Sequence, residues 1–379
     1  MYHVRKGYPF YGTLGMLSIF GLHIDKTDKA SIRRYEFFGL ALPLLFILTI
    51  IVPTALHMVV VTKGNVGINI AEDITVTVSG TSVITTFRRS MMSYSLLHRV
   101  LHNMADCKRF GKPPKMDSTI KHCNMLSVMY ILYVFTGAIM YAVLTQIDAK
   151  QCREISANVE INLFCGTYLP VWLPFDINTK LIFWGQLCAI AWLLLPSSLY
   201  CYIYYEFVEM LMTRIGHLSL YLEDAFVESD VDTRRQKLKI CVDYHAYILS
   251  IADQLVPLLK SSIGHLPVLW AIIFGTIANQ IYNSKPLGAV IFLGGYTAAL
   301  AWLSQAGQTL HDQTLGVSDT LYDLKWYTGT IREIKDIRFM MARSQIPAKL
   351  PATPFGHYQY ALFITIMKTA YSYMTLMRG

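Results

Sequence analysis

The side chains best suited to chemistry are few in this sequence and lie far apart. His98 and His102 have the i, i+4 spacing of a metal-binding pair, but no third ligand is evident near them, so a solvated helical face is the simpler interpretation. The seven cysteines include no CxxC pair and no metal spacing. Cys152 and Cys165 fall in one loop, where they are either bridged or two free thiols. The sequence therefore predicts no catalytic centre, no metal and no cofactor.

One ionisable residue lies inside a long apolar segment near the end of the chain. Lys368 precedes Arg378 by ten residues, which is about 15 Å along a helix. An unpaired lysine in the middle of a membrane costs at least about 2.5–3.5 kcal/mol, so it must meet water, an acid or backbone carbonyls. We expect the water-filled vestibule of a pore to supply this contact. A bend at the start of the helix, which would lower Lys368 toward the cytoplasm, would also serve.

The apolar segments of the chain are long enough to cross a membrane. Hydrophobic residues make up 54% of the sequence and charged residues 15%, whereas soluble domains carry about 25% charged residues. Residues 37–61 contain no charged side chain, and about 20 apolar residues suffice to cross ~30 Å of hydrocarbon. Further apolar segments are 66–87, 125–146, 181–205, 265–283, 287–306 and 355–377. The sequence thus predicts an all-α polytopic membrane protein with seven transmembrane helices.

The second segment, 66–87, is the weakest of the seven because Glu72 and Asp73 lie within it. Either the helix starts after both carboxylates, or they form a polar lid over a ligand cavity. Positive residues accumulate in short cytoplasmic loops, and counting this segment as a span gathers them on one side. In that arrangement, 26 of the 33 Lys and Arg fall in four alternate segments, 1–35, 88–123, 210–264 and 307–354. We therefore expect a cytoplasmic N-terminus, an extracellular C-terminus and a last helix that runs outward.

This orientation and the motifs exclude several classes of protein. The N-terminus of a G-protein-coupled receptor is outside, and neither Asp-Arg-Tyr after the third span nor Asn-Pro-x-x-Tyr in the seventh is present. No internal repeat supports a transporter. The net charge of +8 is spread over four membrane-tethered segments, which favours contact with anionic lipid over nucleic acid. The remaining class is an ion channel whose subunits assemble around a shared pore.

The last 60 residues carry a more specific pattern. Tyr322 and Trp326 are followed by RSQIP at 343–347, by Lys368 and by a closing SYMTLMR at 372–378. This region resembles the C-terminal region of insect odorant receptors, which usually close with Ser-Tyr-Phe-Thr-Leu-Leu-Arg; Met374 and Met377 depart from that pattern. The related gustatory receptors end in Thr-Tyr followed, five residues on, by Gln-Phe. This chain lacks Gln-Phe there, so the odorant branch is preferred.

The resemblance implies a ligand-gated, non-selective cation channel at the plasma membrane of an olfactory neuron. It implies a tetramer formed with an olfactory co-receptor subunit, with a cytoplasmic helical anchor region and a central pore lined by the last helix of each chain. Residues 1–310 would hold six spans, their cytoplasmic loops and the ligand pocket, and residues 311–379 the anchor segment and the pore helix. Tyr322 and Trp326 would lie at a subunit interface. The alternative is a seven-span chemoreceptor of the gustatory type, or one that signals through a cytoplasmic effector.

By its place in the closing motif, Leu376 is expected to gate the pore, with Met374 beside it at the outer mouth. An apolar ring can close a pore by excluding water, and hydroxyls such as those of Thr375 and Thr369 can face permeating ions. Lys368 is expected in the vestibule. The alternative for Leu376 is ordinary packing against a neighbouring helix.

The ligand is expected to bind between helices in the outer half of the bundle. A small volatile must be enclosed almost completely by apolar and aromatic side chains to bind well. Gly137 and Tyr141, one turn apart on one helical face, would place an aromatic wall beside an open space. The candidate residues are Ile74, Val78, Val134, Gly137, Tyr141, Trp184, Cys188, Phe292 and Tyr296. Together they favour a small volatile odorant, with aromatic compounds among the candidates, although each could serve only in helix packing.

Overall fold

The computed structural model of the protein describes residues 9–20, 22, 29–63, 70–158, 163–284 and 287–376. These residues form helices joined by short connections, and their β-structure is limited to two isolated bridges, Phe164 with Val171 and Pro351 with His357. The prediction of an all-α fold is confirmed.

The first half of the described chain holds the shorter helices. They are α1 (Tyr11–Ile19), α2 (Lys29–Phe46), the π-helical turn η1 (Ile47–Ile51), α3 (Val52–Lys63), α4 (Ala71–Met92), α5 (Tyr94–Ala105), α6 (Met116–Ile147) and α7 (Ala149–Asn158). The second half holds α8 (Thr179–Val227), α9 (Val231–Ile263), α10 (Leu266–Ser284), α11 (Leu287–Asp323), the 3₁₀ turn η2 (Trp326–Thr328), α12 (Ile331–Ser344) and α13 (Tyr360–Leu376).

Each of the seven predicted spans falls on a helix, but not every one of these helices has the length and composition of a membrane span. Within the described ranges, four segments do: Tyr35–Lys63, Met116–Ile147, Thr179–Val227 and Leu287–Asp323. A fifth is reached if α9 and α10, which meet at an angle of 40°, count as one span. The predicted segment 66–87 corresponds to α4, whose first turn contains Glu72 and Asp73. The number of spans and their orientation therefore stay predictions.

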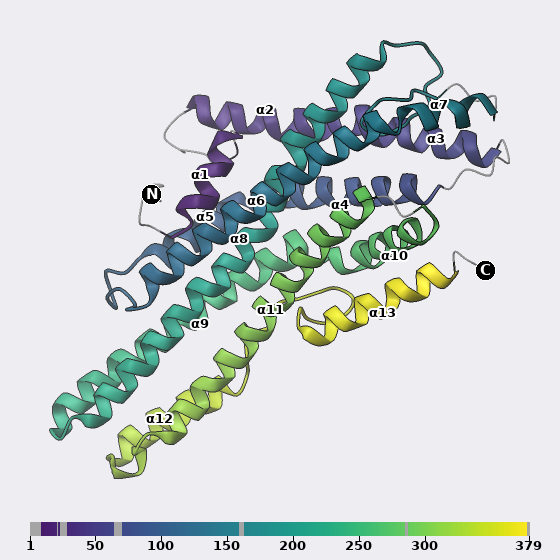
Figure 1. Ribbon diagram of the computed structural model, residues 1–379. Helices are drawn as coiled ribbons and strands as arrows, with labels where there is room; N and C mark the ends of the chain where they lie inside the picture. Colours follow the sequence, from purple (N-terminus) through teal and green to yellow (C-terminus); the bar gives the residue numbers. More distant parts are fainter. Residues whose placement is uncertain are drawn as a thin grey trace.

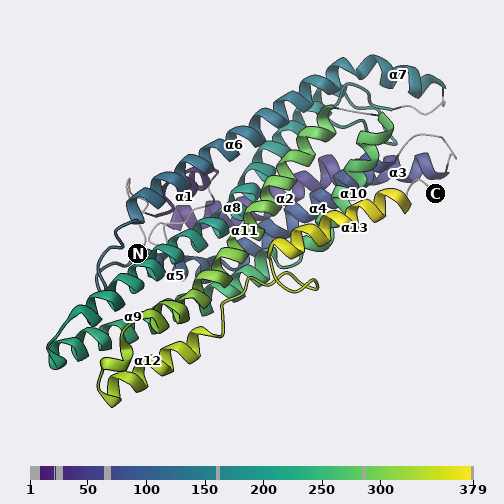
Figure 2. The same ribbon diagram turned by 60° about the horizontal axis from the view of Figure 1, so that its bottom comes forward.

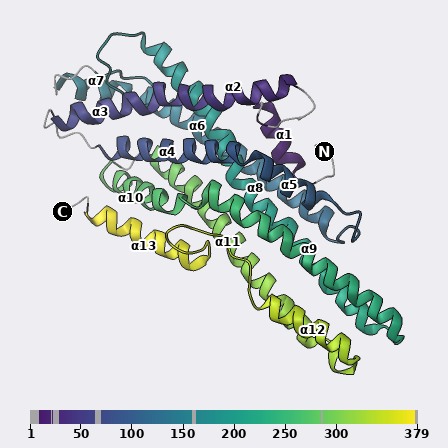
Figure 3. The same ribbon diagram turned by 180° about the vertical axis from the view of Figure 1, so that it is seen from behind.

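The long helix α8 is the centre of the bundle. It contacts α4, α6, α9 and α11, and many of its large side chains, such as Tyr200, Tyr204 and Phe207, are almost completely buried. In Figure 1 the long helices α6, α8, α9 and α11 run along a similar diagonal direction, with α7 near one end of the molecule and α12 at the other. Figure 2 shows α13 on the outside of the bundle. Figure 3, from behind, shows it beside α10.

We call the end of the molecule that carries α12 the anchor region. It comprises residues 210–263 and 307–344, in the lower parts of α8 and α11 together with α9 and α12 (Figures 1 and 2). Within it, Arg214 is 1% exposed and donates to the carbonyl oxygens of Met104 and Asp106 at the end of α5, at 2.7 and 2.9 Å. The guanidinium thus satisfies carbonyls that the helix end leaves unpaired.

The short helix α1 is fixed to the bundle by side chains from other helices. The carboxylate of Glu206 in α8 accepts hydrogen bonds from the backbone N–H of Phe10, at 3.0 Å, and from the hydroxyl of Thr13, at 2.8 Å. The side chain of Asn124 in α6 accepts from the N–H of Gly12, at 2.9 Å. These acceptors satisfy N–H groups that the start of a helix leaves without an intrahelical partner, so α1 is joined to both α6 and α8.

Candidate ligand cavity

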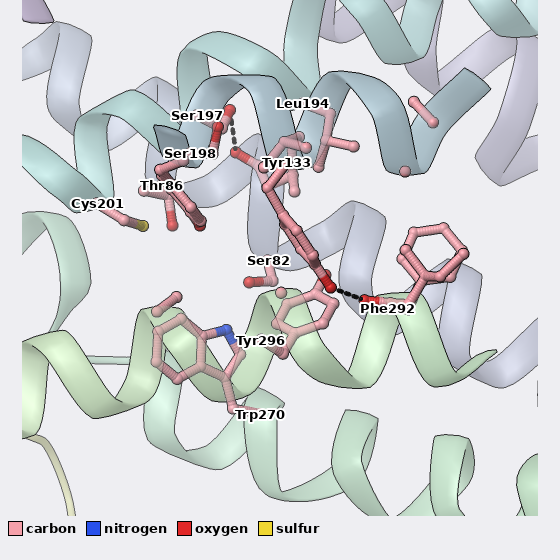
Figure 4. A pocket seen from close by; sticks show the side chains of 18 of the residues that line it. Ser82, Thr86, Tyr133, Leu194, Ser197, Ser198, Cys201, Trp270, Phe292 and Tyr296 are labelled. Carbon is pink, nitrogen blue, oxygen red and sulfur yellow. Dashed lines mark hydrogen bonds between the residues drawn. The ribbon is translucent and has the colours of Figure 1, made fainter. Parts of the chain in front are cut away.

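A cavity of about 110 Å³ lies among α4, α6, α8, α10 and α11 (Figure 4). Five helices from distant parts of the sequence thus build one site. The lining consists mainly of aromatic and small side chains: Ser82, Val83, Thr86, Tyr130, Tyr133, Val134, Gly137, Ala138, Leu194, Ser197, Ser198, Cys201, Leu266, Trp270, Ile291, Phe292, Gly295, Tyr296 and Ala299. This combination of apolar walls with a few polar atoms is typical of sites for small organic molecules.

Small residues on α6 and α11 leave the open space of the cavity. Gly137 and Ala138 in α6 and Gly295 and Ala299 in α11 contribute little side-chain volume to the cavity wall. The two glycines of this set also lie close to neighbouring side chains: a Cβ at Gly137 would lie 3.0 Å from Ile291, and one at Gly295 would lie 3.3 Å from Tyr133. Larger residues at these positions would therefore narrow the cavity or displace its walls.

The aromatic walls are held in place by contacts among the lining residues themselves. The hydroxyl of Tyr133 donates to the carbonyl oxygen of Ile291 at 2.7 Å, which links α6 to α11 (Figure 4). The rings of Trp270 and Tyr296 meet edge to face with centroids 6.3 Å apart. Such contacts fix the rotamers of the rings, so the cavity has a defined shape before a ligand binds.

Hydroxyl and thiol groups gather toward one end of the cavity. Figure 4 shows Thr86, Ser198 and Cys201 toward one end and Phe292 at the other. The Ser198 hydroxyl donates to the carbonyl oxygen of Leu195 at 2.6 Å. The Thr86 hydroxyl is buried and has no hydrogen-bond partner among the described residues. The Thr86 hydroxyl is thus a polar group of the lining that no other described side chain or backbone group satisfies.

Of the predicted ligand residues, the structure brings Val134, Gly137, Phe292 and Tyr296 together in the cavity lining. Tyr141 lies just behind it, because its ring packs against that of Phe292 with centroids 5.2 Å apart. The other four are not part of the lining: Ile74, Val78, Trp184 and Cys188. Trp184 is 60% exposed and instead lines an open apolar groove between α6 and α8, together with Ile139, Phe183 and Leu187.

Sequence reasoning missed the polar end of the cavity, although a signal for it was present. Val78, Ser82 and Thr86 are spaced by four residues and so share one face of α4. The candidate Val78 therefore lies on the same face as the lining residues, but one to two turns nearer the start of the helix. Trp270 was missed because a buried tryptophan in an apolar helix carries no pattern that separates a cavity wall from ordinary packing.

The acidic pair at the start of α4 lies inside the helix rather than before it, so the loop interpretation was wrong. Glu72 accepts a hydrogen bond from the Tyr141 hydroxyl in α6. Asp73 is buried and bonds Nδ1 of His57 in α3 at 2.9 Å. Farther along, the hydroxyl of Thr75 bonds that of Thr276 in α10 at 2.7 Å. The first two turns of α4 are thus joined to three helices by polar contacts.

The predicted pore residues lie on α13, and the face of this helix that carries Ala370 and Tyr373 packs on α10. A Cβ at Gly275 of α10 would come within 2.8 Å of Tyr373 and 3.1 Å of the Ala370 carbonyl oxygen, so the glycine permits close approach of these two helices. Lys368, Thr375 and Leu376 are exposed, Leu376 to 77%, whereas Met374 and Thr369 are partly buried. Met377 and Arg378 of the closing motif lie outside the described residues.

The two predicted interface residues lie next to each other at the connection between α11 and α12. Tyr322 is 68% exposed, and its carbonyl oxygen accepts a hydrogen bond from the indole N–H of Trp326 at 3.2 Å. The tryptophan itself is partly buried against the core of the chain. The neighbouring Tyr327 is also 68% exposed, so this connection presents aromatic side chains to the outside of the chain.

The structure decides between the alternatives for two cysteines and offers no metal site in the part of the chain that it describes. Cys152 in α7 is bridged to Cys165, with a Cα–Cα distance of 5.8 Å. His98 bonds the hydroxyl of Tyr94, one turn before it in α5. Across the described ranges, no group of three or more His, Cys, Asp or Glu is arranged to hold a metal ion.

The helical bundle, its membrane-length apolar helices and the aromatic cavity define a polytopic membrane protein that can hold a small apolar molecule. A family profile described as "7tm Odorant receptor" matches residues 70–371. The chain therefore belongs to the insect odorant receptor family, a family of receptors rather than enzymes. The predicted family is confirmed.

Individual relatives are distant. Odorant receptor 22c of Drosophila melanogaster is 28% identical over 159 residues, which are 41% of this chain and 39% of that receptor. Odorant receptor 67c of the same species is 24% identical over 224 residues, 55% of this chain and 54% of that receptor. The matched regions thus span two-fifths to about half of the length of these curated relatives.

The fold is similar to that of a solved receptor over almost its full length. The insect olfactory receptor OR5 from Machilis hrabei gives a TM-score of 0.74 at 12% identity, covering 96% of this chain and 97% of that one. The structure of OR5 in complex with eugenol gives a TM-score of 0.73. At this level of identity the similarity concerns the fold alone.

Proposed function

We propose that this chain is the odorant-sensing subunit of a ligand-gated, non-selective cation channel. A small volatile would bind in the cavity and thereby open a pore lined by α13. The single observation that carries the proposal is the 110 Å³ cavity, whose walls are aromatic and apolar. The eugenol complex of the similar receptor OR5 supports a small organic molecule as the ligand of this fold.

The packing offers a short route from the cavity to α13. Trp270 lines the cavity and belongs to α10, and Gly275 of the same helix is in close contact with Tyr373 and Ala370 of α13. A ligand that moves the Trp270 ring would displace α10 as a rigid rod, and α10 cannot move without changing its tight contact with α13. Ligand binding would shift the equilibrium between the closed and the open pore only as far as the affinities of the ligand for these two states differ.

One face of α13 is suited to line an aqueous pathway. Thr365, Lys368, Ser372 and Thr375 are exposed and recur every three to four residues, whereas Leu362, Ile366 and Ala370 are buried on the opposite face. Four such helices around an axis would present hydroxyls and the Lys368 ammonium to permeating ions. Leu376, at the described end of this face, is the proposed gate, with Met374 beside it.

The proposed assembly is a tetramer with an olfactory co-receptor subunit in the plasma membrane of an olfactory neuron. The exposed aromatic side chains near Tyr322 and Trp326, at the edge of the anchor region, would contact a neighbouring subunit. Membrane lipid would surround the exposed apolar faces of helices such as α6, where Met129 and Phe135 are 58% and 48% exposed. In this proposal residues 1–310 bind the odorant, and residues 311–379 supply subunit contacts and the pore helix.

The proposal is tested by whole-cell recording from cells that express this chain with and without an insect co-receptor subunit. A panel of small aromatic and aliphatic volatiles is applied while G-protein signalling is blocked. We expect a rapid inward cation current that requires both chains. A Gly137→Leu variant, which fills the cavity, should lose the response, and Gly316→Leu, at a position with open space on α11, should keep it.

Two outcomes would contradict the proposal. A response that disappears under the G-protein block would favour a receptor acting through a cytoplasmic effector. Responses to tastants but to no volatile, with the protein at the cell surface, would favour the gustatory type.

A further inference from the structure

Thr86 differs from most other threonines of α4 in the use of its hydroxyl. Thr75, Thr81 and Thr85 each donate to the carbonyl oxygen one turn earlier in the helix, at 2.7 to 2.8 Å. Thr86 is only 2% exposed, yet its hydroxyl has no hydrogen-bond partner among the described residues. It lines the cavity, and Figure 4 shows it among the side chains that surround the open space.

A buried hydroxyl without a partner is unfavourable, because it has lost its bonds to water and gained none in return. The partner missing from the protein can be supplied by a molecule in the cavity. A hydroxyl group can both donate and accept, so Thr86 fits an alcohol or phenol as well as a carbonyl oxygen. A purely hydrocarbon ligand cannot form a hydrogen bond with Thr86, so it would leave the Thr86 hydroxyl unpaired.

The remaining walls limit the rest of the ligand. Tyr296, Phe292 and Val134 present apolar or aromatic surface, and Phe292 lies at the end of the cavity opposite Thr86 (Figure 4). The volume of about 110 Å³ is of the same order as that of an engineered cavity of about 150 Å³ that binds benzene in another protein. A ligand that enters without displacing the walls is therefore no larger than about one six-membered ring or a short carbon chain.

We propose that the ligand of this cavity is a volatile of about this size with one hydrogen-bonding oxygen, an alcohol, phenol or small carbonyl compound. Its oxygen bonds the Thr86 hydroxyl and its carbon skeleton points toward Phe292. The inference rests on the proposed function to the extent that this ligand is the odorant. Thr86 is then the residue that selects oxygenated compounds over hydrocarbons of the same shape.

The test compares matched pairs of compounds on the wild-type chain and on Thr86→Val, which keeps the shape and removes the hydroxyl. Phenol is paired with toluene, and cyclohexanone with methylcyclohexane. Binding is measured on the purified full-length chain in detergent, by thermal stabilisation and by quenching of tryptophan fluorescence. Currents are recorded in parallel from cells that also express the co-receptor. Thr81→Val, which removes an exposed hydroxyl already bonded to Thr77, is the control.

We expect wild-type protein to bind the oxygenated member of a pair more tightly, and Thr86→Val to weaken that binding about tenfold, equivalent to about 1.4 kcal/mol. Hydrocarbon binding should be unchanged or improved by Thr86→Val, and Thr81→Val should change neither. The difference between phenol and cyclohexanone shows whether Thr86 acts mainly as acceptor or as donor. Because the Thr86 hydroxyl is unpaired in the free protein, its removal should not reduce surface expression.

The failures are distinguishable. Selective binding that depends on Thr86, without any current, would support this inference and overturn the proposed channel function. Currents with equal potency for both members of a pair, unchanged by Thr86→Val, would overturn this inference and leave the proposed function standing. Failure of the wild-type chain to bind any of the four compounds would also overturn the inference.

Discussion

The hydroxyl of Tyr141 donates a hydrogen bond to Glu72, which joins α6 to the first turn of α4 directly behind the ligand cavity. The same ring packs against Phe292, with centroids 5.2 Å apart, and Phe292 forms one end of the cavity. Tyr141 therefore positions a cavity wall without lining the cavity itself. The contact also holds two helices together beyond the end of the cavity that Phe292 forms.

We expect Tyr141→Phe, which keeps the ring and removes the hydrogen bond, to raise the half-maximal odorant concentration about threefold to tenfold. This corresponds to the roughly 1 kcal/mol that a hydrogen bond contributes in proteins. Tyr141→Leu, which also removes the ring contact with Phe292, should have a larger effect. Dose–response curves of odorant-evoked current measure both. Tyr11→Phe, at an exposed position of α1, is the control and should leave the curve unchanged.

The sequence predicted the positions of the helices better than it predicted where along the helices the cavity lies. On α6 and α11, four of the residues chosen from the sequence line the cavity: Val134, Gly137, Phe292 and Tyr296. On α4, the chosen Val78 lies one turn before Ser82, where the cavity begins. Their role in ligand binding stays a prediction. Apolar periodicity indicates which side of a helix faces the core. It carries no information on the offset between neighbouring helices along their axes.

Contacts between distant segments were beyond sequence reasoning for a related reason. Glu206 bonds Thr13 across 193 residues, and neither residue has a neighbour in sequence that marks the pairing. The acidic pair in α4 looked like a loop because each carboxylate is unfavourable in an apolar segment. Only the structure supplies the partners, Tyr141 for Glu72 and His57 for Asp73, that make a helix possible there.

Gly307 in α11 should not tolerate a side chain. A Cβ at this position would lie 1.9 Å from the carbonyl oxygen of Tyr358, whose own hydroxyl bonds the Ile263 carbonyl oxygen at 2.8 Å. The segment before α13 thus lies directly against α11 and α9 and has no room to move away. We expect Gly307→Ala to reduce surface expression and to lower the melting temperature of the solubilised protein by several degrees, corresponding to a cost of about 1–3 kcal/mol from overpacking.

The matched control for this substitution is Gly316→Ala, nine residues farther along the same helix. A Cβ there would meet nothing within 4 Å. Since alanine is the better helix former, Gly316→Ala should be neutral or stabilising by up to about 1 kcal/mol. Equal melting temperatures for the two variants would contradict the proposed close contact between α11 and the segment before α13.

Within the anchor region, Arg234 of α9 and Glu333 of α12 form an ion pair at 3.1 Å, in which the carboxylate is 1% and the guanidinium 11% exposed. Glu333 also completes a capping box with Thr330 at the start of α12. Removal of one member would leave the other buried without its partner. We expect Glu333→Gln to destabilise the docking of α12 by about 3 kcal/mol, visible as protease cleavage between α11 and α12. Asp336→Asn, at an exposed position of the same helix, should have no such effect.

The same pair predicts a dependence on pH. Burial by itself would raise the pKa of Glu333, but the hydrogen bonds from Arg234 and Thr330 outweigh it and lower the pKa below its ordinary value. A carboxyl group whose pKa is lower in the folded state stabilises that state above its unfolded pKa of about 4.3. This contribution is lost as the pH falls through the folded value. The melting temperature should therefore fall more between pH 6 and pH 3 in the wild type than in Glu333→Gln, and parallel curves would count against the pair.

The disulfide between Cys152 and Cys165 should protect two of the seven cysteines from alkylation in the unfolded, unreduced protein. It closes a loop with a sequence separation of 13, for which chain-entropy reasoning gives about 3 kcal/mol of stabilisation. We expect intact mass spectrometry to find five alkylated cysteines without reductant and seven with it. Cys152→Ser combined with Cys165→Ser should lower the melting temperature, whereas Cys188→Ser, at an exposed free thiol, should not. Seven alkylated cysteines without reductant would show that the bridge is absent.

Lys368 is the charged residue on the exposed face of α13, one turn from Thr365 and from Ser372 on that face. If this face lines the pore, the ammonium groups repel cations, and divalent cations about twice as strongly as monovalent ones. A unit charge about 4 Å from a permeating cation changes the free energy of that cation by about 1 kcal/mol in water. This change is equivalent to about a fivefold change in a permeability ratio. We therefore expect Lys368→Gln to raise the permeability of Ca²⁺ relative to Na⁺ by about twofold to fivefold, measured as a shift of the reversal potential in channels with the co-receptor. Lys121→Gln, at an exposed position of α6, controls for the loss of charge alone. An unchanged reversal potential in Lys368→Gln, with currents of normal size, would place this face of α13 outside the ion path.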